Sequence, residues 1–375
     1  MLNDKNSTKY LLITLEYPPF KGGVGHYYFN MVSSVAKAMA NKGDSIKVIS
    51  NNENKLVDKT RSFLKWWPAV KTLHLELKRG EADYVLVGHL LPLGTVAWML
   101  SFVYKFKYCV FLHGYDLNIA LAQPRKSALA KAILNKADKI ICANSYIEAE
   151  VKKIISTADL NKVALVNPGI EGETVVYNEG KIEALKNRYN LAEKTVLLTV
   201  GRLVKRKGVD IALEALKIAL KQAPELVYIV IGQGEEEANL RAKIADLGQS
   251  GQVQILTDID DEAKMNWYKL ADIFIMTARQ IGADMEGFGI VYLEAGLAGK
   301  PVIAGKSGGV ADAVEDNVNG LLVDPTNPEQ IAEAIIKLAK YERLRQRLGD
   351  EGRRRALTMF SWKKQAEKIY NIISK

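Results

Sequence analysis

The sequence predicts an α/β fold of two doubly wound domains, and three observations lead to it. Short apolar runs rich in β-branched residues alternate along the chain with segments of helical length. That alternation is typical of a parallel sheet with helices on both faces. The pattern starts afresh after the run VALVNPGI, and 375 residues are long for one domain but ordinary for two.

The first domain is expected over residues 1–170. Its predicted strands are KYLLITLEY, SIKVIS, DYVLVG, KYCVFLHG and KIICANS, and a helix-length segment follows each. The second domain is expected over 171–355, with strands at KTVLLTVGR, LVYIVIGQG, VQILTD, DIFIMTA and KPVIAG. Gly169 and Gly172 favour a hinge between the domains. The amphipathic run SWKKQAEKIYNIISK predicts a C-terminal helix within 356–375 that packs back toward the first domain.

Composition and termini exclude several classes of protein. The polar start MLNDKNSTKY is not a signal peptide, and no run reaches the roughly 20 apolar residues of a spanning helix. Cys109 and Cys142 lie in apolar strand-like runs, which favours buried free thiols in a reducing compartment. No cluster of His and Cys suggests a zinc site. We therefore expect a cytoplasmic protein.

The excess positive charge lies in the first domain. Residues 1–170 contain 23 Lys/Arg and 13 Asp/Glu, whereas residues 171–375 contain 29 and 30. The first domain is therefore expected to face an anionic surface or substrate. A nucleic-acid partner is not expected, because no recognisable nucleic-acid-binding module accompanies the charge.

Glycine-rich loops follow several predicted strands, at the places where open α/β sheets bind ligands. In PPFKGGVGHYY, Gly22 and Gly23 let backbone N–H groups approach a phosphate or a sugar. The dinucleotide fingerprint G-x-G-x-x-G is incomplete because Tyr28 takes the third glycine position, so an NAD site is disfavoured. The alternative is a tight turn without a ligand.

A histidine and two cations also follow predicted strands. His113 in FLHGYDL can hydrogen-bond a sugar hydroxyl or a phosphate, and Asp116 can orient its ring. The alternative is a structural histidine. In VGRLVKRKG, Arg202 and Lys207 can converge on one diphosphate, and the alternative is a basic surface turn. The two cations between them, Lys205 and Arg206, are expected in solvent.

Two glutamates stand eight positions apart in MEGFGIVYLEAG. A helix is predicted from about Gly289, with Gly299 as its stop. If the stretch from Glu286 to Glu294 is largely helical, it rises roughly 12 Å, whereas paired glycosidase carboxyls stand about 5–9.5 Å apart. The two are therefore expected to contact separate parts of one extended ligand, with Glu294 two turns deeper than Glu286. The free N–H groups at the helix start favour an anion.

The D-x-D spacing of Asp258 and Asp260 resembles a metal-binding motif. It lies in DIDDEAKMNWY, where acidic residues are ordinary in the first turn of a helix. We therefore expect no metal there.

Together these motifs resemble the retaining glycosyltransferases of family 4. The resemblance rests on EGFGIVYLE, which matches the family's E-x7-E, on the Arg and Lys of GRLVKRKG, and on GGVG, HGYD, GQG, SGGV and VNPG. It covers nearly the whole chain. It implies the GT-B fold, in which two Rossmann-like domains face a central cleft. The first domain would bind the acceptor and the second the sugar nucleotide.

The resemblance also implies site residues. His113 would contact the transferred sugar or the phosphate, Arg202 and Lys207 the departing diphosphate, and Glu286 the donor sugar. The remaining implied donor-binding residues are Gly22, Gly23, Gly201, Gly232, Asp260, Gly287, Phe288, Gly289, Ile290 and Glu294, with Glu294 on the ribose. Tyr17 and Asp116 are candidates for acceptor or orienting contacts.

The resemblance implies retaining transfer without a metal or other cofactor, because Arg, Lys and helix dipoles stabilise the leaving diphosphate. The motifs are most similar to those of GDP-mannose-dependent phosphatidylinositol mannosyltransferases. That similarity favours GDP-mannose as the donor and a lipid or lipid-linked glycan as the acceptor. Asp260 falls where a carboxylate would accept from guanine. UDP- or ADP-sugars, and a non-catalytic nucleotide-sugar-binding protein, stay open as alternatives.

A segment of the first domain combines cations with aromatic residues. Residues 55–79 contain seven Lys/Arg against Asp58 and Glu76. Tryptophan beside lysine suits a membrane interface with anionic lipid. We expect peripheral binding at the inner face of the membrane; the alternative is that the tryptophans pack into the core. The expected contact residues are Lys59, Arg61, Phe63, Lys65, Trp66 and Trp67.

Overall fold

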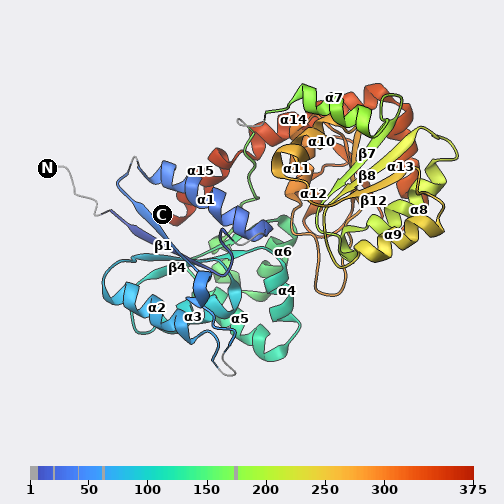
Figure 1. Ribbon diagram of the computed structural model, residues 1–375. Helices are drawn as coiled ribbons and strands as arrows, with labels where there is room; N and C mark the ends of the chain where they lie inside the picture. The colour runs from blue at the N-terminus through green and yellow to red at the C-terminus, as the bar shows by residue number, and fades with distance from the viewer. Residues whose placement is uncertain (1–6, 20–21, 41, 61–63, 173–175) are drawn as a thin grey trace. The chain divides into compact units, whose positions relative to one another are not determined.

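The computed structural model describes residues 7–19, 22–40, 42–60, 64–172 and 176–375. The chain divides into two compact units (Figure 1). Unit 1 comprises residues 1–169 and 362–375, and unit 2 comprises residues 170–361. The second domain was expected to end at residue 355, but its last helix continues to Met359 and the chain enters unit 1 again at Trp362.

Unit 1 contains a six-stranded parallel sheet in the order β2-β1-β3-β4-β5-β6. The four central strands, β1, β3, β4 and β5, are buried on both faces because helices cover both. The bounds of the six strands are β1 (Lys9–Thr14), β2 (Ser45–Ser50), β3 (Tyr84–Val87), β4 (Lys107–Leu112), β5 (Lys139–Cys142) and β6 (Val163–Leu165). All carboxyl ends of these strands therefore meet at one edge of the sheet, which we call the carboxyl edge, opposite the amino edge.

The helices of unit 1 form two layers. In Figure 1, α1 and α15 lie on one side of the sheet, and α2, α3 and α5 on the other. Their bounds are α1 (Gly23–Ala40), η1 (Asn52–Asn54), α2 (Trp67–Lys78), η2 (Leu90–Gly94), α3 (Thr95–Leu100), α4 (Tyr115–Leu121), α5 (Pro124–Lys136), α6 (Ser145–Ile154), η3 (Thr157–Lys162) and α15 (Trp362–Ile373). Helix α1 starts at Gly23, so this glycine of the predicted strand-to-helix loop is already helical.

The C-terminal helix α15 completes the core of unit 1. It packs against α1, and its buried face joins the cluster formed by α1 and one side of the sheet. Its buried residues are Trp362, Gln365, Ala366, Ile369, Tyr370 and Ile373. The Trp362 ring lies 5.3 Å from that of Tyr27, and Tyr370 Oη donates to Asp44 at 2.8 Å. The end of the chain is thus tied to its first strands and helices.

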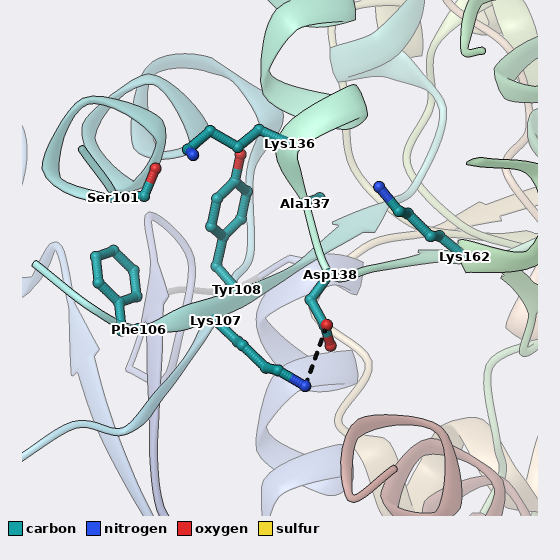
Figure 2. Close-up of a pocket in the computed structure, with 8 residues that line it drawn as sticks. All are labelled: Ser101, Phe106, Lys107, Tyr108, Lys136, Ala137, Asp138 and Lys162. Carbon is teal, nitrogen blue, oxygen red and sulfur yellow. Dashed lines mark ion pairs between the residues drawn. The ribbon is translucent and has the colours of Figure 1, made fainter. Parts of the chain in front are cut away.

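A cavity of about 240 Å³ opens at the amino edge of the unit 1 sheet (Figure 2). Its lining includes Phe106, Lys107, Lys136, Asp138 and Lys162. Lys107 Nζ pairs with an Asp138 carboxylate oxygen at 3.4 Å. The cavity is therefore rich in cations and lies away from the strand ends where ligands of α/β sheets usually bind.

Unit 2 has a second six-stranded parallel sheet in the order β12-β11-β10-β7-β8-β9. The strands are β7 (Thr195–Val200), β8 (Leu226–Ile231), β9 (Val253–Leu256), β10 (Ile273–Met276), β11 (Val302–Gly305) and β12 (Gly320–Val323). The helices are α7 (Glu179–Arg188), η4 (Lys205–Lys207), α8 (Val209–Ala219), α9 (Glu237–Asp246), α10 (Asp261–Leu270), α11 (Ile290–Leu297), α12 (Val310–Ala313), α13 (Pro328–Lys340) and α14 (Glu342–Met359).

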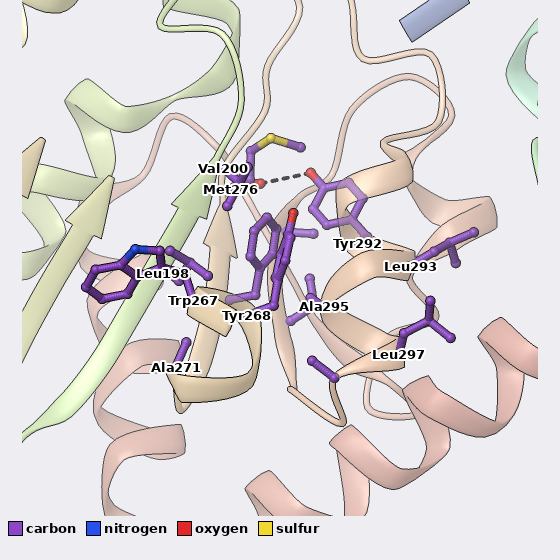
Figure 3. Close-up of a cluster of buried hydrophobic side chains, with 14 of the residues drawn as sticks. Leu198, Val200, Trp267, Tyr268, Ala271, Met276, Tyr292, Leu293, Ala295 and Leu297 are labelled. Atoms are coloured by element: carbon purple, nitrogen blue, oxygen red, sulfur yellow. Dashed lines mark hydrogen bonds between the residues drawn. The ribbon is translucent and has the colours of Figure 1, made fainter. Parts of the chain in front are cut away.

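Large aromatic side chains fill one face of the unit 2 sheet (Figure 3). Trp267, Tyr268 and Tyr292 are fully buried there. Tyr292 Oη donates to the carbonyl oxygen of Met276 at 2.9 Å, so the hydroxyl keeps a partner inside the apolar cluster. This cluster fixes α10 and α11 against the central strands. The predicted donor-binding residues Ile290 and Glu294 lie in α11, and Asp260 directly precedes α10.

The predicted α/β class and all ten predicted strands are confirmed. The sequence missed β6 and β12, each at a sheet edge. Cys109 and Cys142 are buried free thiols, as expected, and burial raises the pKa of both. Among the residues that the structure describes, no helix is both long and apolar enough to cross a bilayer.

Candidate donor-binding site

Glu286 is a buried carboxylate of unit 2 with two cationic partners. It lies in the loop between β10 and α11, where its side chain is buried. One oxygen, Oε2, accepts from Lys207 Nζ and from Arg206 Nη1, each at 2.6 Å. Burial alone would raise the pKa of Glu286, but the charges of Lys207 and Arg206 outweigh it and hold the pKa below its usual value. Glu286 is therefore an ionised, fixed acceptor.

Arg206 was expected in solvent, and that prediction is wrong. Its side chain is only 11% exposed. The guanidinium bridges two carboxylates, with Nη1 on Glu286 and Nε on Asp284 Oδ2 at 3.1 Å. The planar fork of arginine can hold two acceptors at once, which a point-charged lysine does less well. Arg206 and Asp284 are thus site residues that sequence reasoning missed.

The cations of VGRLVKRKG separate into two environments. Lys207 is buried against Glu286, whereas Arg202 is exposed directly after β7. Convergence of Arg202 and Lys207 on a diphosphate stays a prediction. In the structure the Lys207 ammonium group is paired with the Glu286 carboxylate. Turning Lys207 Nζ to a phosphate would leave Glu286 paired with Arg206.

Two glycines after β7 and β8 let the chain pass at very close range. A Cβ on Gly232 would lie 1.9 Å from the carbonyl oxygen of Gly201. Both residues have positive φ, 155° and 151° for Gly201 and Gly232. These backbone conformations favour glycine at both positions. The fold alone therefore accounts for the two glycines, and a bound donor is not needed to explain them.

Glu294 lies in α11 and has its own partners. Its Oε2 accepts from Tyr268 Oη at 2.6 Å, and Lys264 Nζ contacts Oε1 at 3.3 Å. Helix α11 begins at Ile290, so only half of the stretch from Glu286 is helical. Glu294 therefore lies about one turn inside the helix, so the expected two helical turns are wrong and the rise calculated for a largely helical stretch does not apply.

The turn between the two glutamates leads into α11 through a glycine. Gly289 precedes the helix in a left-handed conformation, φ 82°. A Cβ there would meet the Tyr292 ring at 2.4 Å. Phe288 is buried against Phe360, with ring centroids 5.6 Å apart. The Glu286 carbonyl accepts from Gly309 N at 3.1 Å, which ties the loop holding Gly287 to the start of α12.

Asp260 caps helix α10. Its Oδ1 accepts from Ala263 N at 2.7 Å, the ordinary role of an aspartate before a helix. Guanine recognition by Asp260 stays a prediction, and only the second carboxylate oxygen is outside the cap. In the described part of the chain, no group of three or more His, Cys, Asp or Glu side chains is placed to hold a metal ion.

In unit 1, His113 lies directly after β4 at the carboxyl edge of the sheet. Its Nε2 is 2.8 Å from Tyr28 Oη, and Tyr28 Oη donates to the Gly88 carbonyl at 2.7 Å. Since the Tyr28 proton goes to Gly88, His113 donates Nε2–H to the tyrosine oxygen, and Nδ1 carries the lone pair. Burial lowers the pKa of His113 to about 4, so its ring is neutral at physiological pH.

Asp116 does not orient this ring through a hydrogen bond. Its Oδ2 accepts from Leu90 N at 3.2 Å and its Oδ1 from Gly114 N at 3.3 Å. Tyr28, which the sequence had only placed in the position of a missing glycine, is the partner of His113. Tyr17 is half-buried and packs edge-on against Phe29, with ring centroids 6.1 Å apart.

The remaining predicted positions of unit 1 lie on its surface. Gly23 is exposed, and Gly22 is half-buried and accepts from His26 N at 3.1 Å through its carbonyl. Lys59 and Lys65 are exposed, Trp66 is half-buried and Trp67 is 39% exposed. Arg61 and Phe63 lie outside the described residues. Neither tryptophan is fully buried in the core.

The fold has clear likenesses among solved structures. HepE of Anabaena in complex with UDP has a TM-score of 0.80 at 19% identity and covers 98% of this chain and 100% of that one. A glycosyltransferase of Rickettsia africae has a TM-score of 0.80 at 20% identity, covering 99% of both chains. These structures define the class: two doubly wound units of the GT-B glycosyltransferase fold.

Sequence comparison gives the family of the second unit. Residues 181–355 match the model of the group 1 glycosyl transferases. They form a group 1 glycosyltransferase domain, and the protein is a glycosyltransferase. A GDP-mannose-dependent alpha-(1-6)-phosphatidylinositol monomannoside mannosyltransferase of Mycolicibacterium smegmatis is 27% identical over 380 residues, covering 97% of this chain and 98% of the relative. Spore coat protein SA of Bacillus subtilis is 26% identical, covering 96% and 97%.

Proposed function

We propose that the protein is a retaining, metal-independent glycosyltransferase of family 4. It transfers mannose from GDP-mannose to a lipid or a lipid-linked glycan. The observation that supports it best is the buried Glu286, ionised and fixed by Arg206 and Lys207 at the start of α11. A fixed carboxylate suits sugar hydroxyls, and adjacent cations suit a leaving diphosphate.

In this proposal each group has one role. Glu286 accepts from hydroxyls of the donor sugar. Lys207 turns toward the diphosphate, where Arg202 and the N–H groups at the start of α11 also stabilise the negative charge. The neutral His113 accepts a hydrogen bond from a sugar hydroxyl at Nδ1. Glu294, fixed by Tyr268, binds the ribose.

The bond changes follow from retention. The bond between the anomeric carbon and the diphosphate oxygen breaks, and the acceptor oxygen bonds to that carbon on the same face. The acceptor's proton passes to the departing phosphate oxygen, so that the protein itself forms no covalent bond to the sugar.

The donor is proposed from the relatives. Full-length relatives are named as GDP-mannose-dependent enzymes that act on phosphatidylinositol mannosides. A UDP-sugar is the second candidate, because HepE, with the same fold, binds UDP.

A donor panel tests the function. Purified protein is incubated with GDP-mannose, UDP-glucose or ADP-glucose together with membrane lipids, and products are separated by chromatography. We expect transfer of mannose from GDP-mannose and greatly reduced transfer by Glu286→Gln. Transfer from UDP-glucose alone would establish the second candidate. Absence of both transfer and donor hydrolysis with every sugar nucleotide would refute the enzymatic proposal and leave a nucleotide-sugar-binding protein.

An enzyme with a lipid acceptor also has to reach the surface of a bilayer. We propose peripheral binding of unit 1 at the inner face of the membrane, supported by the positive charge of residues 1–170 and by the names of the relatives. The sequence alone pointed to Lys59, Lys65, Trp66 and Trp67 as the contact.

A further inference from the structure

The turn after α3 exposes large apolar side chains at the amino edge of unit 1. Phe102 is 65% exposed and Val103 is 74% exposed, and the nearby Met99 is also exposed. Single exposed apolar residues are normal, but an apolar cluster on a tight turn points to an interaction site. Trp98 supports the Phe102 ring edge-on, with centroids 5.3 Å apart, so the apolar tip is held in place.

The helical layer that carries this apolar tip is rich in cations. The segments 64–79, 95–107 and 124–139, which form α2, α3, α5 and their flanks, contain eleven Lys/Arg and only two acidic residues. Both acidic residues are already paired. Glu76 is buried and binds Lys47 at 2.6 Å, and Asp138 binds Lys107 and accepts from Tyr84 Oη at 2.7 Å. The helical layer therefore presents a strongly positive face.

Two further carboxylates near the amino edge reduce the positive charge in part, because the side chain of Lys9 pairs with only one of them. Glu81 and Asp83 precede β3. Lys9 engages both of them, through its Nζ to Glu81 at 3.8 Å and through its backbone N–H to Asp83 at 2.9 Å.

The cavity at the amino edge adjoins the tip. Lys107, Lys136 and Lys162 line it together with the carboxylate of Asp138 (Figure 2). Lys107 pairs with Asp138 and Lys162 with Asp159 at 2.5 Å. Lys136 Nζ lies 4.4 Å from the centre of the Phe102 ring, which links the apolar tip directly to the cavity. Lysine ammonium groups on flexible stems suit a phosphate whose position varies.

We propose that this surface docks on an anionic phospholipid bilayer. Phe102 and Val103 enter the boundary between headgroups and acyl chains, and Lys107 and Lys136 bind headgroup phosphates at the cavity. An apolar tip within a field of lysines matches the two layers that a bilayer presents. A nucleic acid would satisfy the lysines but would leave Phe102 and Val103 unused.

This contact differs from the one expected from the sequence. Trp67 starts α2 near the carboxyl edge of the sheet, because α2 follows β2, whereas Phe102 follows the end of α3 near the amino edge. The proposal builds on the proposed function, since an enzyme with a lipid-linked acceptor works at a bilayer. Its test does not require turnover.

Co-sedimentation of the full chain with vesicles tests the proposal. The vesicles contain phosphatidylcholine alone or phosphatidylcholine mixed with phosphatidylglycerol. We expect binding to the mixed vesicles and little to the neutral ones. The double variant Phe102→Ser/Val103→Ser should have a vesicle partition coefficient at least about tenfold lower, because it buries less apolar area in the bilayer. Lys107→Gln/Lys136→Gln should lose about tenfold or more, at about 1 kcal/mol per cation.

Matched variants in unit 2 control for size and net charge. Val176→Ser changes a side chain that is 80% exposed, and Lys194→Gln/Lys221→Gln removes two exposed cations. Both should bind vesicles as the unaltered protein does. The circular dichroism spectrum and melting temperature of every variant show that it is folded.

Three outcomes would overturn the proposal. The first is undiminished vesicle binding by Phe102→Ser/Val103→Ser. The second is loss of binding with Trp67→Ser and not with the Phe102/Val103 variant, which would assign the contact to α2. The third combines two results. Inorganic phosphate and chloride displace the protein from vesicles equally at the same ionic strength, and Lys107→Gln/Lys136→Gln binds as the unaltered protein does. Together they would show that the cavity does not bind headgroup phosphates. Donor hydrolysis in the absence of vesicles reports separately on the proposed function.

Discussion

At the residue scale, one carboxylate oxygen of the candidate site accepts hydrogen bonds from two cations. Glu286 Oε2 accepts from both Arg206 and Lys207, and Asp284 holds the other side of the Arg206 guanidinium. If Lys207 turns to the donor diphosphate, Arg206 alone keeps Glu286 ionised and in position. Arg206 is thus a positioning residue that acts through Glu286.

Replacing Arg206 tests that role. We expect Arg206→Ala to raise the pKa of Glu286, because one of its two compensating charges is lost. The acid limb of the pH profile of kcat/KM should then move to higher pH. The cost in stability should be about 2 kcal/mol at neutral pH, below the 3–5 kcal/mol of a buried charge left without any partner. Arg206→Lys should restore the pH profile in part.

The control for this prediction is Arg343→Ala, which removes an exposed arginine from unit 2. It should change neither the pH profile nor the stability. An acid limb that stays in place in Arg206→Ala, with activity retained, would show that Lys207 suffices to hold Glu286.

His113 gives a prediction on stability and pH. Its pKa falls to about 4 from an ordinary value of 6.5 because of burial. Between these pH values the unfolded chain binds a proton that the folded protein does not, so stability rises with pH across this window. Urea denaturation of His113→Asn should show a shallower rise between pH 4 and 6.5 than the unaltered protein shows. An identical slope would contradict the neutral, buried state of His113.

Sequence reasoning found the residue types of the site and missed their pairings. Glu286, Lys207 and His113 follow strand ends and stand in recognisable motifs. The bridging role of Arg206 depends on Asp284, which is 78 positions away, and no local pattern encodes that separation. The acidic pair in GADMEG offered a weak signal that a nearby cation would be needed. Tyr28 was noted only as the residue that replaces a glycine.

At the element scale, α15 is the feature with the largest structural effect. It lies at the end of the chain but belongs to the core of unit 1. Trp362 is fully packed against unit 1, and the added Cβ of any residue other than glycine at 169 would meet its ring at 2.6 Å. Helix α15 therefore covers a part of the unit 1 core that residues 1–169 leave uncovered.

Trp362→Ala measures this contribution. Removal of a buried tryptophan side chain costs about 3–5 kcal/mol. We expect a loss of this size in the denaturant transition of unit 1 and no change in that of unit 2. The matched change Trp267→Ala removes an equally buried tryptophan from unit 2, and should reverse the pattern. A shared loss in both units would contradict the division of the core.

The sequence predicted the elements with strong apolar runs better than it predicted short or edge elements. Strands buried on both faces, such as β4 and β8, are continuous apolar runs and were found. The edge strands β6 and β12, of three and four residues, form because a neighbouring strand offers hydrogen-bonding groups. The boundary between α14 and α15 was misplaced because a helical pattern runs through most of residues 342–373, interrupted only near Phe360.

At the scale of the whole molecule, the two units have separate cores. The clusters of unit 2 and the cluster formed by α1, α15 and the unit 1 sheet share no residue. The group 1 glycosyltransferase match lies entirely within unit 2. A nucleotide that binds the proposed donor residues therefore stabilises unit 2 directly.

Calorimetry with GDP tests this separation. We expect two thermal transitions, and GDP should raise the temperature of the unit 2 transition. At a free GDP concentration a hundredfold above Kd, binding adds about 2.7 kcal/mol to the unfolding free energy of unit 2 by mass action. Trp267→Ala identifies which transition belongs to unit 2. An equal rise in both transitions would show that the nucleotide couples the units. UDP serves as the comparison ligand, and a larger rise with UDP would reverse the preferred base.

The return of the chain to unit 1 sets an order for folding during synthesis. Residues 170–361 are contiguous, so unit 2 can close its core before the last residues are made. Unit 1 cannot complete its core at that stage, because the hydrogen-bond partners of Tyr10 and Asp44 are Ile373 and Tyr370 of α15. The domain that is synthesised first is thus the last to be completed, against the usual order of amino-terminal domains first. While the ribosome still holds the final helix, the open face of α1 is exposed to chaperones and proteases.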